Sequence, residues 1–317
     1  MLAPGWRNPF KAPGAWRKAN LHAHTTHSDG RVDLQTRVNE YAAAGWDVLA
    51  ITDHHAITDL KGLQAPPGFV VLPGAELHPG NPFGGDRYHL VCLNVEQARD
   101  ARTAAHPQEV IDEVTGRGGL VYFAHPYWCK HKLRDFEPLS GYTGVEVYNH
   151  GCRDAGRPDS GAQWDDLLAQ SGVCPGIATD DCHGPGGASD TYGGWTWIRT
   201  EERSREAAIE ALRGGMNYSS SGPEILALEI EDAVLGGNGK PQVATHRITV
   251  RTSPVREIFF VSDVSGSCCE PDPEAARGGA TIAEGSFVVR PGCRYVRVEI
   301  LDHAGRKAWS NPIPFAW

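Results

Sequence analysis

Nine histidine, aspartate and glutamate residues follow one another in the order and spacing of a site for several metal ions. They are His22, His24, Asp29, His54, Glu76, His89, His125, Asp181 and His183. Imidazole and carboxylate ligands in this mixture suit zinc, manganese or iron. Because such ions lower the pKa of bound water toward neutrality, the residues predict a hydrolytic centre with two or three divalent metal ions.

These residues need a fold that brings distant segments together. His22 and His24 stand two positions apart at the end of the strand-like run WRKANLHAH, so both imidazoles project to the same side. Most of the other candidates also follow strand-like runs, such as DVLAITDH and GLVYFAHP. If these strands form a parallel sheet, their carboxyl ends meet at one end of it, which is where barrel enzymes have their active sites.

Amphipathic segments typical of helices lie between the strand-like runs. Leu34, Val38 and Tyr41 repeat at helical spacing, and Asp33 is the candidate N-cap of that helix. Ser204 is the candidate cap of another helix near the end of this region. The alternation of strands and helices over the first two thirds of the chain predicts successive βα units.

The last third of the chain has a different pattern. From residue 225 onward, six strand-like runs follow one another without helices, separated by Gly, Pro, Asp and Ser turns. In RYVRVEI, polar and apolar side chains alternate, as in a strand with one buried face. We therefore predict two domains, a catalytic one over residues 1–221 and a β-sandwich-like accessory one over residues 222–317.

The motifs HAHTTHSDG, AITDH, GAE, AHP and DDCH, in this order, resemble the successive motifs of the PHP superfamily, the polymerase and histidinol phosphatase domain. The resemblance covers roughly residues 16–221. It implies a distorted (β/α)7 barrel, an α/β fold that is followed here by the all-β domain. It also implies that all nine residues named above are metal ligands and that the chain is a metal-dependent phosphoesterase.

The charge of the nine ligands favours a phosphate substrate. Three divalent ions (+6), three carboxylates (−3) and one bridging hydroxide (−1) leave +2, which balances a phosphate monoester dianion. With two ions the site would be neutral and would suit an uncharged ester, amide or carbamate equally well. We expect a hydroxide that bridges two ions near Glu76 to attack the phosphorus of a small phosphate ester or nucleotide.

Further residues are candidates for roles beside the metals. Asp53 precedes the candidate ligand His54 and is expected to accept hydrogen bonds from metal-bound imidazoles or water, which gives it a catalytic role. The stretch GVEVYNHGCR resembles a segment of the family that ends another barrel strand. This resemblance implies that Asn149 and Arg153 bind substrate, with Arg153 as a fork-shaped partner of phosphate.

The composition excludes several other classes of protein. A net charge of −9 and a pI near 5.9 argue against binding of duplex nucleic acid or an anionic membrane. No apolar run approaches the length of a membrane span, and the first residues do not form a signal peptide. Eight cysteines without a CxxC pair predict mostly reduced, buried thiols. We expect a cytoplasmic protein whose partner is a small molecule, in an oligomeric state that the sequence leaves open.

Two alternatives to a phosphoesterase remain. The first is a metal-dependent hydrolase of a neutral ester, amide or carbamate, which would use the same hydroxide. The second is a non-catalytic, metal-containing binding module whose β domain recognises a partner. Such a module would be marked by lost ligands, and all nine ligand positions are filled in this chain.

Overall fold

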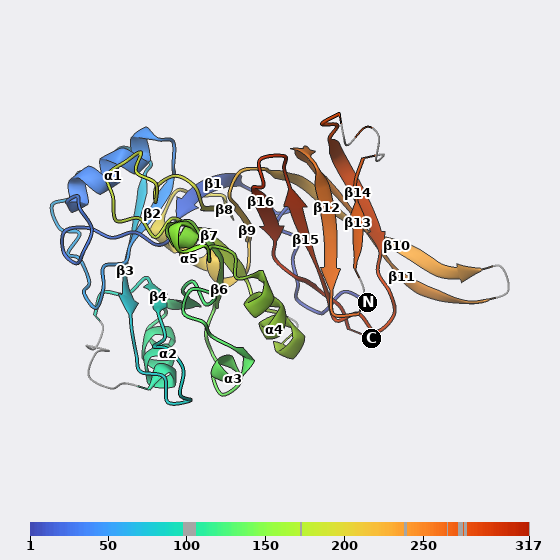
Figure 1. Cartoon of the computed structure of the whole chain (residues 1–317), viewed down its shortest axis with the longest axis horizontal. Coiled ribbons are helices and arrows are strands. Elements are labelled where there is room, and N and C mark those ends of the chain that lie inside the picture. Colours follow the sequence, from blue (N-terminus) through green and yellow to red (C-terminus); the bar gives the residue numbers. More distant parts are fainter. Residues whose placement is uncertain are drawn as a thin grey trace.

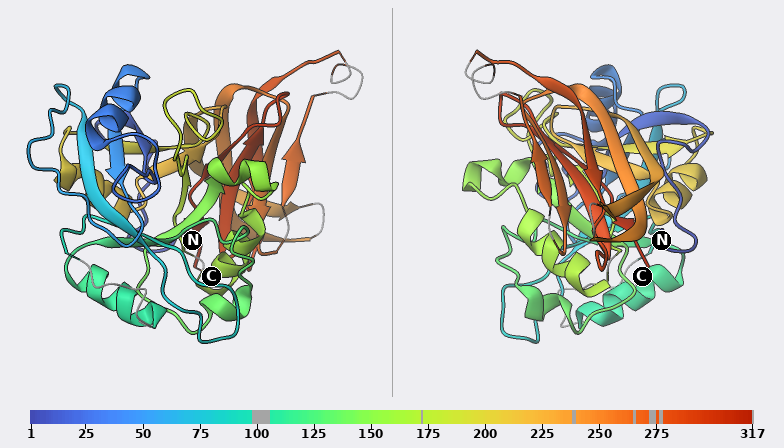
Figure 2. Two further views of the ribbon diagram at one scale, coloured as in Figure 1. Left: turned by 60° about the vertical axis from the view of Figure 1, so that its left-hand side comes forward. Right: turned by 90° about the vertical axis from the view of Figure 1, so that its right-hand side faces the viewer.

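The computed structural model describes residues 1–97, 106–171, 173–237, 240–264, 266–271, 275 and 278–316. It has two parts that lie side by side (Figure 1). The first two thirds of the chain form strands and helices, and the last third forms β-strands. Both chain ends lie on the β-rich part (Figure 2), where the Met1 amino group donates to the carbonyl oxygen of Ala316 at 2.6 Å.

The first part is built on a curved mixed sheet. Its strands are β1 (Ala15–Asn20), β2 (Val48–Ile51), β3 (Val70–Leu77), β4 (Leu90–Leu93), β5 (Leu120–Phe123), β6 (Gly144–Asn149), β7 (Gly176–Thr179), β8 (Trp195–Thr200) and β9 (Asn217–Ser220). They pair in the order β9-β8-β1-β2-β3-β4-β5-β6-β7. The last strand returns to β8, where the Ala178 amide donates to Oγ1 of Thr196 at 3.0 Å and this hydroxyl donates to the Ala178 carbonyl at 2.9 Å. These contacts close the distorted barrel that the sequence predicted.

Two strands of the barrel run against their neighbours. β4 pairs antiparallel with β3 and β5, and β8 pairs antiparallel with β1 and β9, whereas the sequence predicted a parallel sheet. The connection from β3 to β4, residues 78–89, forms no helix, and parallel pairing usually requires a helical crossover. Since β4 is reversed, its first residue, Leu90, pairs with Leu77 at the end of β3. His89 therefore reaches the same end of the barrel as Glu76.

The helices follow the amphipathic segments of the sequence. They are α1 (Leu34–Ala43), α2 (Pro107–Gly116), α3 (Leu133–Phe136), the 3-10 helix η1 (Gly151–Ala155), α4 (Gly161–Ser171) and α5 (Arg205–Arg213). Asp33 caps α1 by accepting from the amide of Thr36 at 3.0 Å, and Ser204 caps α5 by accepting from the amide of Ala207 at 3.2 Å. Both predicted caps are confirmed. Among the described residues, every helix is too short or too polar to cross a membrane.

The barrel strands are covered on both faces. Every residue of β2, β4, β5 and β7 is buried, which explains why these strands are near-continuous apolar runs. The eight cysteines are free thiols and six of them are buried, as the sequence predicted. Rigid, buried strands of this kind hold the residues at their ends in fixed positions.

The second part is a pair of packed sheets. One sheet contains β10 (Ile225–Gly237), β11 (Lys240–Val255) and β14 (Ile282–Val288). The other contains β12 (Glu257–Ser262), β13 (Ser267–Cys269), β15 (Tyr295–Leu301), β16 (Lys307–Ser310) and β17 (Ile313–Pro314). Ile248 and Val250 of the first sheet share a core with Phe260 and Val298 of the second. This arrangement confirms the predicted sandwich-like region.

The two parts are joined by a continuous sheet. β16 pairs antiparallel with β9, so Trp309 lies opposite Ser219 and the barrel sheet runs on into the sandwich. Arg297 of β15 also binds Asp165 of α4 with two hydrogen bonds of 2.9 Å. The N-terminal segment that contains Trp6 packs against the core of the sandwich.

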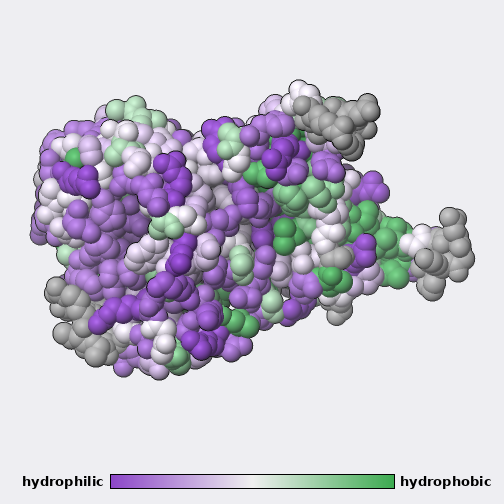
Figure 3. Space-filling view, viewed as in Figure 1, coloured by the Kyte–Doolittle hydropathy of each residue, from purple (hydrophilic) through white to green (hydrophobic). Residues whose placement is uncertain are grey.

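Two strands of the sandwich extend beyond the rest of it. β10 and β11 continue as a two-stranded ribbon past the residues of β11 that pair with β14. Figure 3 shows hydrophobic residues gathered over the sandwich and the ribbon, whereas the face of the barrel in this view is mostly hydrophilic. Val234 on the ribbon is 60% exposed.

Candidate metal centre

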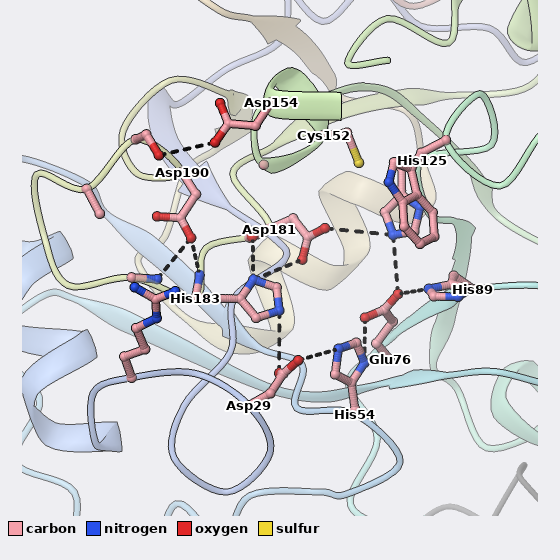
Figure 4. Close-up of a pocket in the computed structure, with 16 residues that line it drawn as sticks. Asp29, His54, Glu76, His89, His125, Cys152, Asp154, Asp181, His183 and Asp190 are labelled. Atoms are coloured by element: carbon pink, nitrogen blue, oxygen red, sulfur yellow. Dashed lines mark hydrogen bonds and ion pairs between the residues drawn. The ribbon is translucent and has the colours of Figure 1, made fainter. Parts of the chain in front are cut away.

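The structure brings all nine predicted ligands together at one end of the barrel. Each of them lies within 4.0 Å of at least one other member of the set. Figure 4 shows several of these side chains pointing toward one another around Glu76, Asp181 and Asp29. They come from chain segments more than 150 residues apart, which the barrel strands bring to a common end.

The first and last pairs of ligands lie on adjacent segments. Ala23 and Cys182 form a parallel bridge, with the amide of His24 donating to the Cys182 carbonyl at 3.0 Å. The bridge aligns the HxH pair with the DxH pair, because the flanking residues project to the same side of each segment. Asp181 has a φ of +52° and His125 a φ of +29°, conformations that non-glycine residues rarely adopt. Such strain concentrates at functional sites.

Glu76 lies at the centre of the cluster and is 1% exposed. Its Oε2 atom is 3.2 Å from Nε2 of His22 and 2.8 Å from Nδ1 of His54. Its Oε1 atom is 2.7 Å from Nδ1 of His89 and 3.3 Å from Nε2 of His125. Burial alone would raise the pKa of Glu76, but the imidazoles of His22 and His89 outweigh it and hold the pKa well below its usual range. Glu76 therefore connects two sets of imidazoles, one on each carboxylate oxygen.

Asp181 faces Glu76 from the other side of the cluster. Its Oδ1 atom is 3.2 Å from Nε2 of His22 and 3.0 Å from Nε2 of His24. Burial would raise the pKa of Asp181, but His22 and His24 lower it well below its usual range. Burial opposes a charge on His22 as well, yet the carboxylates of Asp181, Glu146 and Glu76 raise its pKa well above the ordinary value. The two carboxylates and two imidazoles form a buried set that we call the inner group: His22, His24, Glu76 and Asp181.

Two further groups adjoin the inner group. The middle group is His89 and His125 on Oε1 of Glu76. Burial lowers the pKa of His89 to about 4, so this imidazole is neutral near pH 7 and one of its nitrogens is able to bind a cation. The outer group is Asp29, His54 and His183, in which both imidazoles lie 3.4 Å from the Asp29 carboxylate. Asp29 is half exposed, so the outer group opens toward solvent.

The geometry of the groups fits bound divalent ions. Nε2 of His22 and Oε2 of Glu76 are buried and form no hydrogen bond with any residue that the structure describes, although they lie only 3.2 Å apart. Buried polar atoms without a partner are rare, and each needs an explanation. Two ligands at about 2.0 to 2.2 Å from one zinc ion are about 3.3 to 3.6 Å apart at tetrahedral angles. The contacts of 3.2 to 3.5 Å around Glu76 are close to this spacing.

An open cavity of about 450 Å³ lies over the three groups. Asp29, His54, Glu76 and His183 are part of its wall, together with Asp154 of η1 and Asp190 of the connection between β7 and β8 (Figure 4). Trp128 lies beside the middle group, with its ring centroid 5.2 Å from that of His125. Arg31 also lines this cavity and brings a positive charge to it. Sequence reasoning missed Arg31, which follows the SDG motif directly.

Glu146 is a second residue that sequence reasoning missed. It is fully buried in β6, and its Oε1 atom lies 2.7 Å from Nδ1 of His22. Its Oε2 atom accepts from the amide of His125 at 2.8 Å and from Nδ2 of Asn149 at 2.9 Å. The sequence does contain a signal for this role. Glu146 stands between Val145 and Val147 in an apolar strand, and a carboxylate buried in such a strand needs polar partners.

Asp53 lies behind the cluster. Its carboxylate accepts from the amide of Thr25 at 2.7 Å and from the hydroxyls of Thr25, Ser28 and Thr58. None of these contacts involves a predicted ligand. Asp53 therefore orders the loop that leads to Asp29, and its catalytic role stays a prediction without a contact that supports it.

Asn149 and Arg153 differ in their distance from the predicted ligands. Asn149 is fully buried and donates to Oδ2 of Asp181 at 3.1 Å, so it holds this candidate ligand in place. Arg153 lines a different cavity, at the junction with the sandwich, and its guanidinium donates to the carbonyl of Ser189 at 3.4 Å. The 3-10 helix η1 separates the two cavities, because Cys152 and Asp154 line one and Arg153 lines the other.

Comparisons with known proteins agree with this architecture. No family model matches the chain. An uncharacterized protein of Methanocaldococcus jannaschii is 29% identical over 158 residues, covering 43% of this chain and 84% of that protein. A solved two-domain protein from Bacteroides vulgatus, which contains a predicted PHP-like metal-dependent phosphoesterase, has a TM-score of 0.53 at 15% identity and covers 95% of this chain and 96% of its own. The chain therefore has a PHP-like two-domain fold, with clustered histidine, glutamate and aspartate residues that could hold metal ions.

Proposed function

We propose that the chain is a metal-dependent phosphoesterase that hydrolyses a small phosphate ester or nucleotide. The observation that carries the proposal is the position of Glu76, whose two carboxylate oxygens face two separate sets of imidazoles beneath an open cavity. A carboxylate in this position is suited to holding two ions close together. Metal pairs of this kind are used for hydrolytic displacement at phosphorus.

Each part of the site has a role in this proposal. The inner, middle and outer groups would each hold one divalent zinc, manganese or iron ion, which would make water nucleophilic and offset charge on the phosphoryl oxygens. Glu146 and Asn149 keep His22 and Asp181 in place from behind. Trp128 covers the imidazole of His125 at the edge of the cavity. Arg31, which lines the cavity, would bind the phosphate group of the substrate.

The size and charge of the cavity support a small anionic substrate. Its volume of about 450 Å³ lies within the range of small-molecule sites. Three divalent ions with the three carboxylates among the nine predicted ligands and one hydroxide leave a charge of +2, which matches a phosphate monoester. The half-exposed Asp29 supports the third ion, because it is the carboxylate of the outer group.

A second candidate function is hydrolysis of a neutral ester, amide or carbamate. Asp154 favours it, because this carboxylate lines the same cavity and would repel a dianion. With only two ions bound, these ions, one hydroxide and the three carboxylates of the predicted ligands, Asp29 included, leave no net charge, and an uncharged carbonyl compound would fit.

The test is a substrate panel combined with metal analysis. The protein would be stripped with a chelator, reloaded with zinc, manganese or iron, and assayed with p-nitrophenyl phosphate, bis-p-nitrophenyl phosphate and p-nitrophenyl acetate. The proposal expects phosphomonoester turnover that requires metal and saturates near three ions per chain. Turnover of the acetate alone with two ions would favour the second candidate, and no turnover with any metal would refute both.

A further inference from the structure

His78 lies beside the metal centre but is not one of the nine predicted ligands. It follows β3 directly, two residues after Glu76. In an extended segment, residues two apart project to the same side. The Glu76–His78 pair thus has the same spacing as His22 with His24 and Asp181 with His183, each at the end of a barrel strand.

The side chain of His78 points into the cluster. Its Nε2 atom is 3.3 Å from Oε1 of Glu76, the same distance as Nε2 of His125. One ring nitrogen each of His78 and His54 and one carboxylate oxygen of Glu76 lie within 4.8 Å of one another, a spacing that allows a shared ion. The ring stacks on His89 with a centroid distance of 3.6 Å and meets the ring of His54 edge-on at 4.7 Å.

The Nε2 atom of His78 has no hydrogen-bond partner in the described part of the chain, and it is buried. Burying a polar nitrogen without a partner is costly, so the site needs something that this nitrogen binds. His22 shows the same combination, a buried Nε2 without a hydrogen bond at 3.2 Å from Glu76. By burial, distance and lack of a partner, His78 resembles a ligand more than a supporting residue.

We propose that His78 is a tenth metal ligand, which binds through Nε2 the ion that Glu76 holds on Oε1 beside His89 and His125. The inference rests on the proposed metal centre and extends it. It adds a third imidazole to the middle group, which then contains three nitrogens and one carboxylate oxygen. A nitrogen-rich set favours zinc or iron over magnesium or calcium.

The experiment compares two substitutions that separate ligation from ring packing. His78→Asn removes the imidazole, and His78→Phe keeps a flat ring against His89 but has no nitrogen. His246→Asn, in the sandwich, is the control for loss of a histidine elsewhere. Metal content after dialysis and zinc affinity from chelator competition would be measured for each protein, with circular dichroism and thermal melting to verify the fold.

We expect both His78 variants to bind one of the ions at least tenfold more weakly than the unaltered protein, and the cobalt-loaded forms to differ in their visible absorption. His246→Asn should match the unaltered protein. Binding by His78→Phe equal to that of the unaltered protein would assign His78 to packing and overturn the inference, while leaving the proposed function intact. An unaltered protein that binds no metal would overturn both.

A measurement on the unaltered protein covers the case in which the variants do not fold. A crystal structure with zinc, located by its anomalous signal, would show Nε2 of His78 within about 2.0 to 2.3 Å of an ion if the inference is correct. A separation beyond about 3 Å from every ion, with the nine other ligands bound, would exclude His78 as a ligand.

Discussion

Nδ1 of His22 and Oε1 of Glu146 meet at 2.7 Å, and both side chains are fully buried. This contact turns Nε2 of His22 toward Glu76 and Asp181. A carboxylate behind a metal-binding imidazole fixes its tautomer and raises its basicity. The contact between His22 and Glu146 therefore sets the orientation of His22 within the inner group.

Replacement of Glu146 by Gln should weaken metal binding at the inner group. Four donors meet the Glu146 carboxylate, from His22, His125, Asn149 and Thr179, and glutamine offers one oxygen and a competing donor. We expect metal affinity to fall about 10- to 100-fold. Isothermal titration of the stripped protein with zinc would measure this change. An affinity equal to that of the unaltered protein would show that Glu146 has no part in orienting His22.

Replacement of Asp181 by Asn should remove metal and activity together. The amide keeps the shape of the side chain but loses the charge that faces His22 and His24. We expect loss of at least one ion per chain and a fall in turnover of at least 100-fold, because the water would no longer be activated. Far-ultraviolet circular dichroism would verify that the fold is retained. Turnover that survives the loss of metal would remove Asp181 from the site.

Replacement of Arg31 by Met should raise KM for a phosphate monoester by about tenfold, with a smaller effect on kcat. A charge-assisted hydrogen bond to phosphate is worth about 1.5 to 3 kcal/mol, and Arg31 lines the cavity. Arg153→Met is the matched control, because Arg153 lines the neighbouring cavity. Steady-state kinetics on both variants would show the difference. A larger effect from Arg153→Met would restore the substrate role that the sequence predicted for that residue.

Replacement of Glu299 by Gln should lower stability at neutral pH but not in acid. Burial raises the pKa of Glu299, but Lys307 and Arg297 outweigh burial and lower it below its ordinary value. A carboxylate with a depressed pKa stabilises the fold above its unfolded pKa of about 4.3, and this stabilisation is lost as the pH falls through the folded value. We expect a deficit of about 1.5 to 3 kcal/mol at pH 7.

Urea unfolding of the metal-free protein at pH 7 and pH 3.5 would measure this effect. The difference between the unaltered protein and Glu299→Gln should shrink in acid. Glu284→Gln, an exposed position in β14, should match the unaltered protein at both values. A deficit that grows as the pH falls would mean that the ion pairs of Glu299 with Lys307 and Arg297 do not set its pKa.

Much of the architecture followed from periodicity in the sequence. The caps at Asp33 and Ser204 lie where the pattern placed them, because a short polar side chain before an amphipathic run has few other roles. The reversals of β4 and β8 were not predicted, because periodicity gives no strand direction. Only the missing helices between β3 and β4 and between β7 and β8 hinted at them.

The candidate site was predictable where it depended on spacing. Pairs such as His22 with His24 share a face by strand geometry alone. Glu146 and Asn149 were harder, because their role depends on which strand lies behind which ligand. Arg153 illustrates the same limit, since the turn of η1 directs it away from the cavity that its neighbours line.

The pairing of β16 with β9 has a consequence for any attempt to isolate the barrel. A fragment that stops near residue 221 would leave β9 with an unsatisfied row of amide and carbonyl groups on one flank. Open flanks of this kind recruit strands from other molecules. The C-terminal region thus covers this flank of the barrel, and we expect the shorter fragment to aggregate during purification even with all nine candidate ligands present.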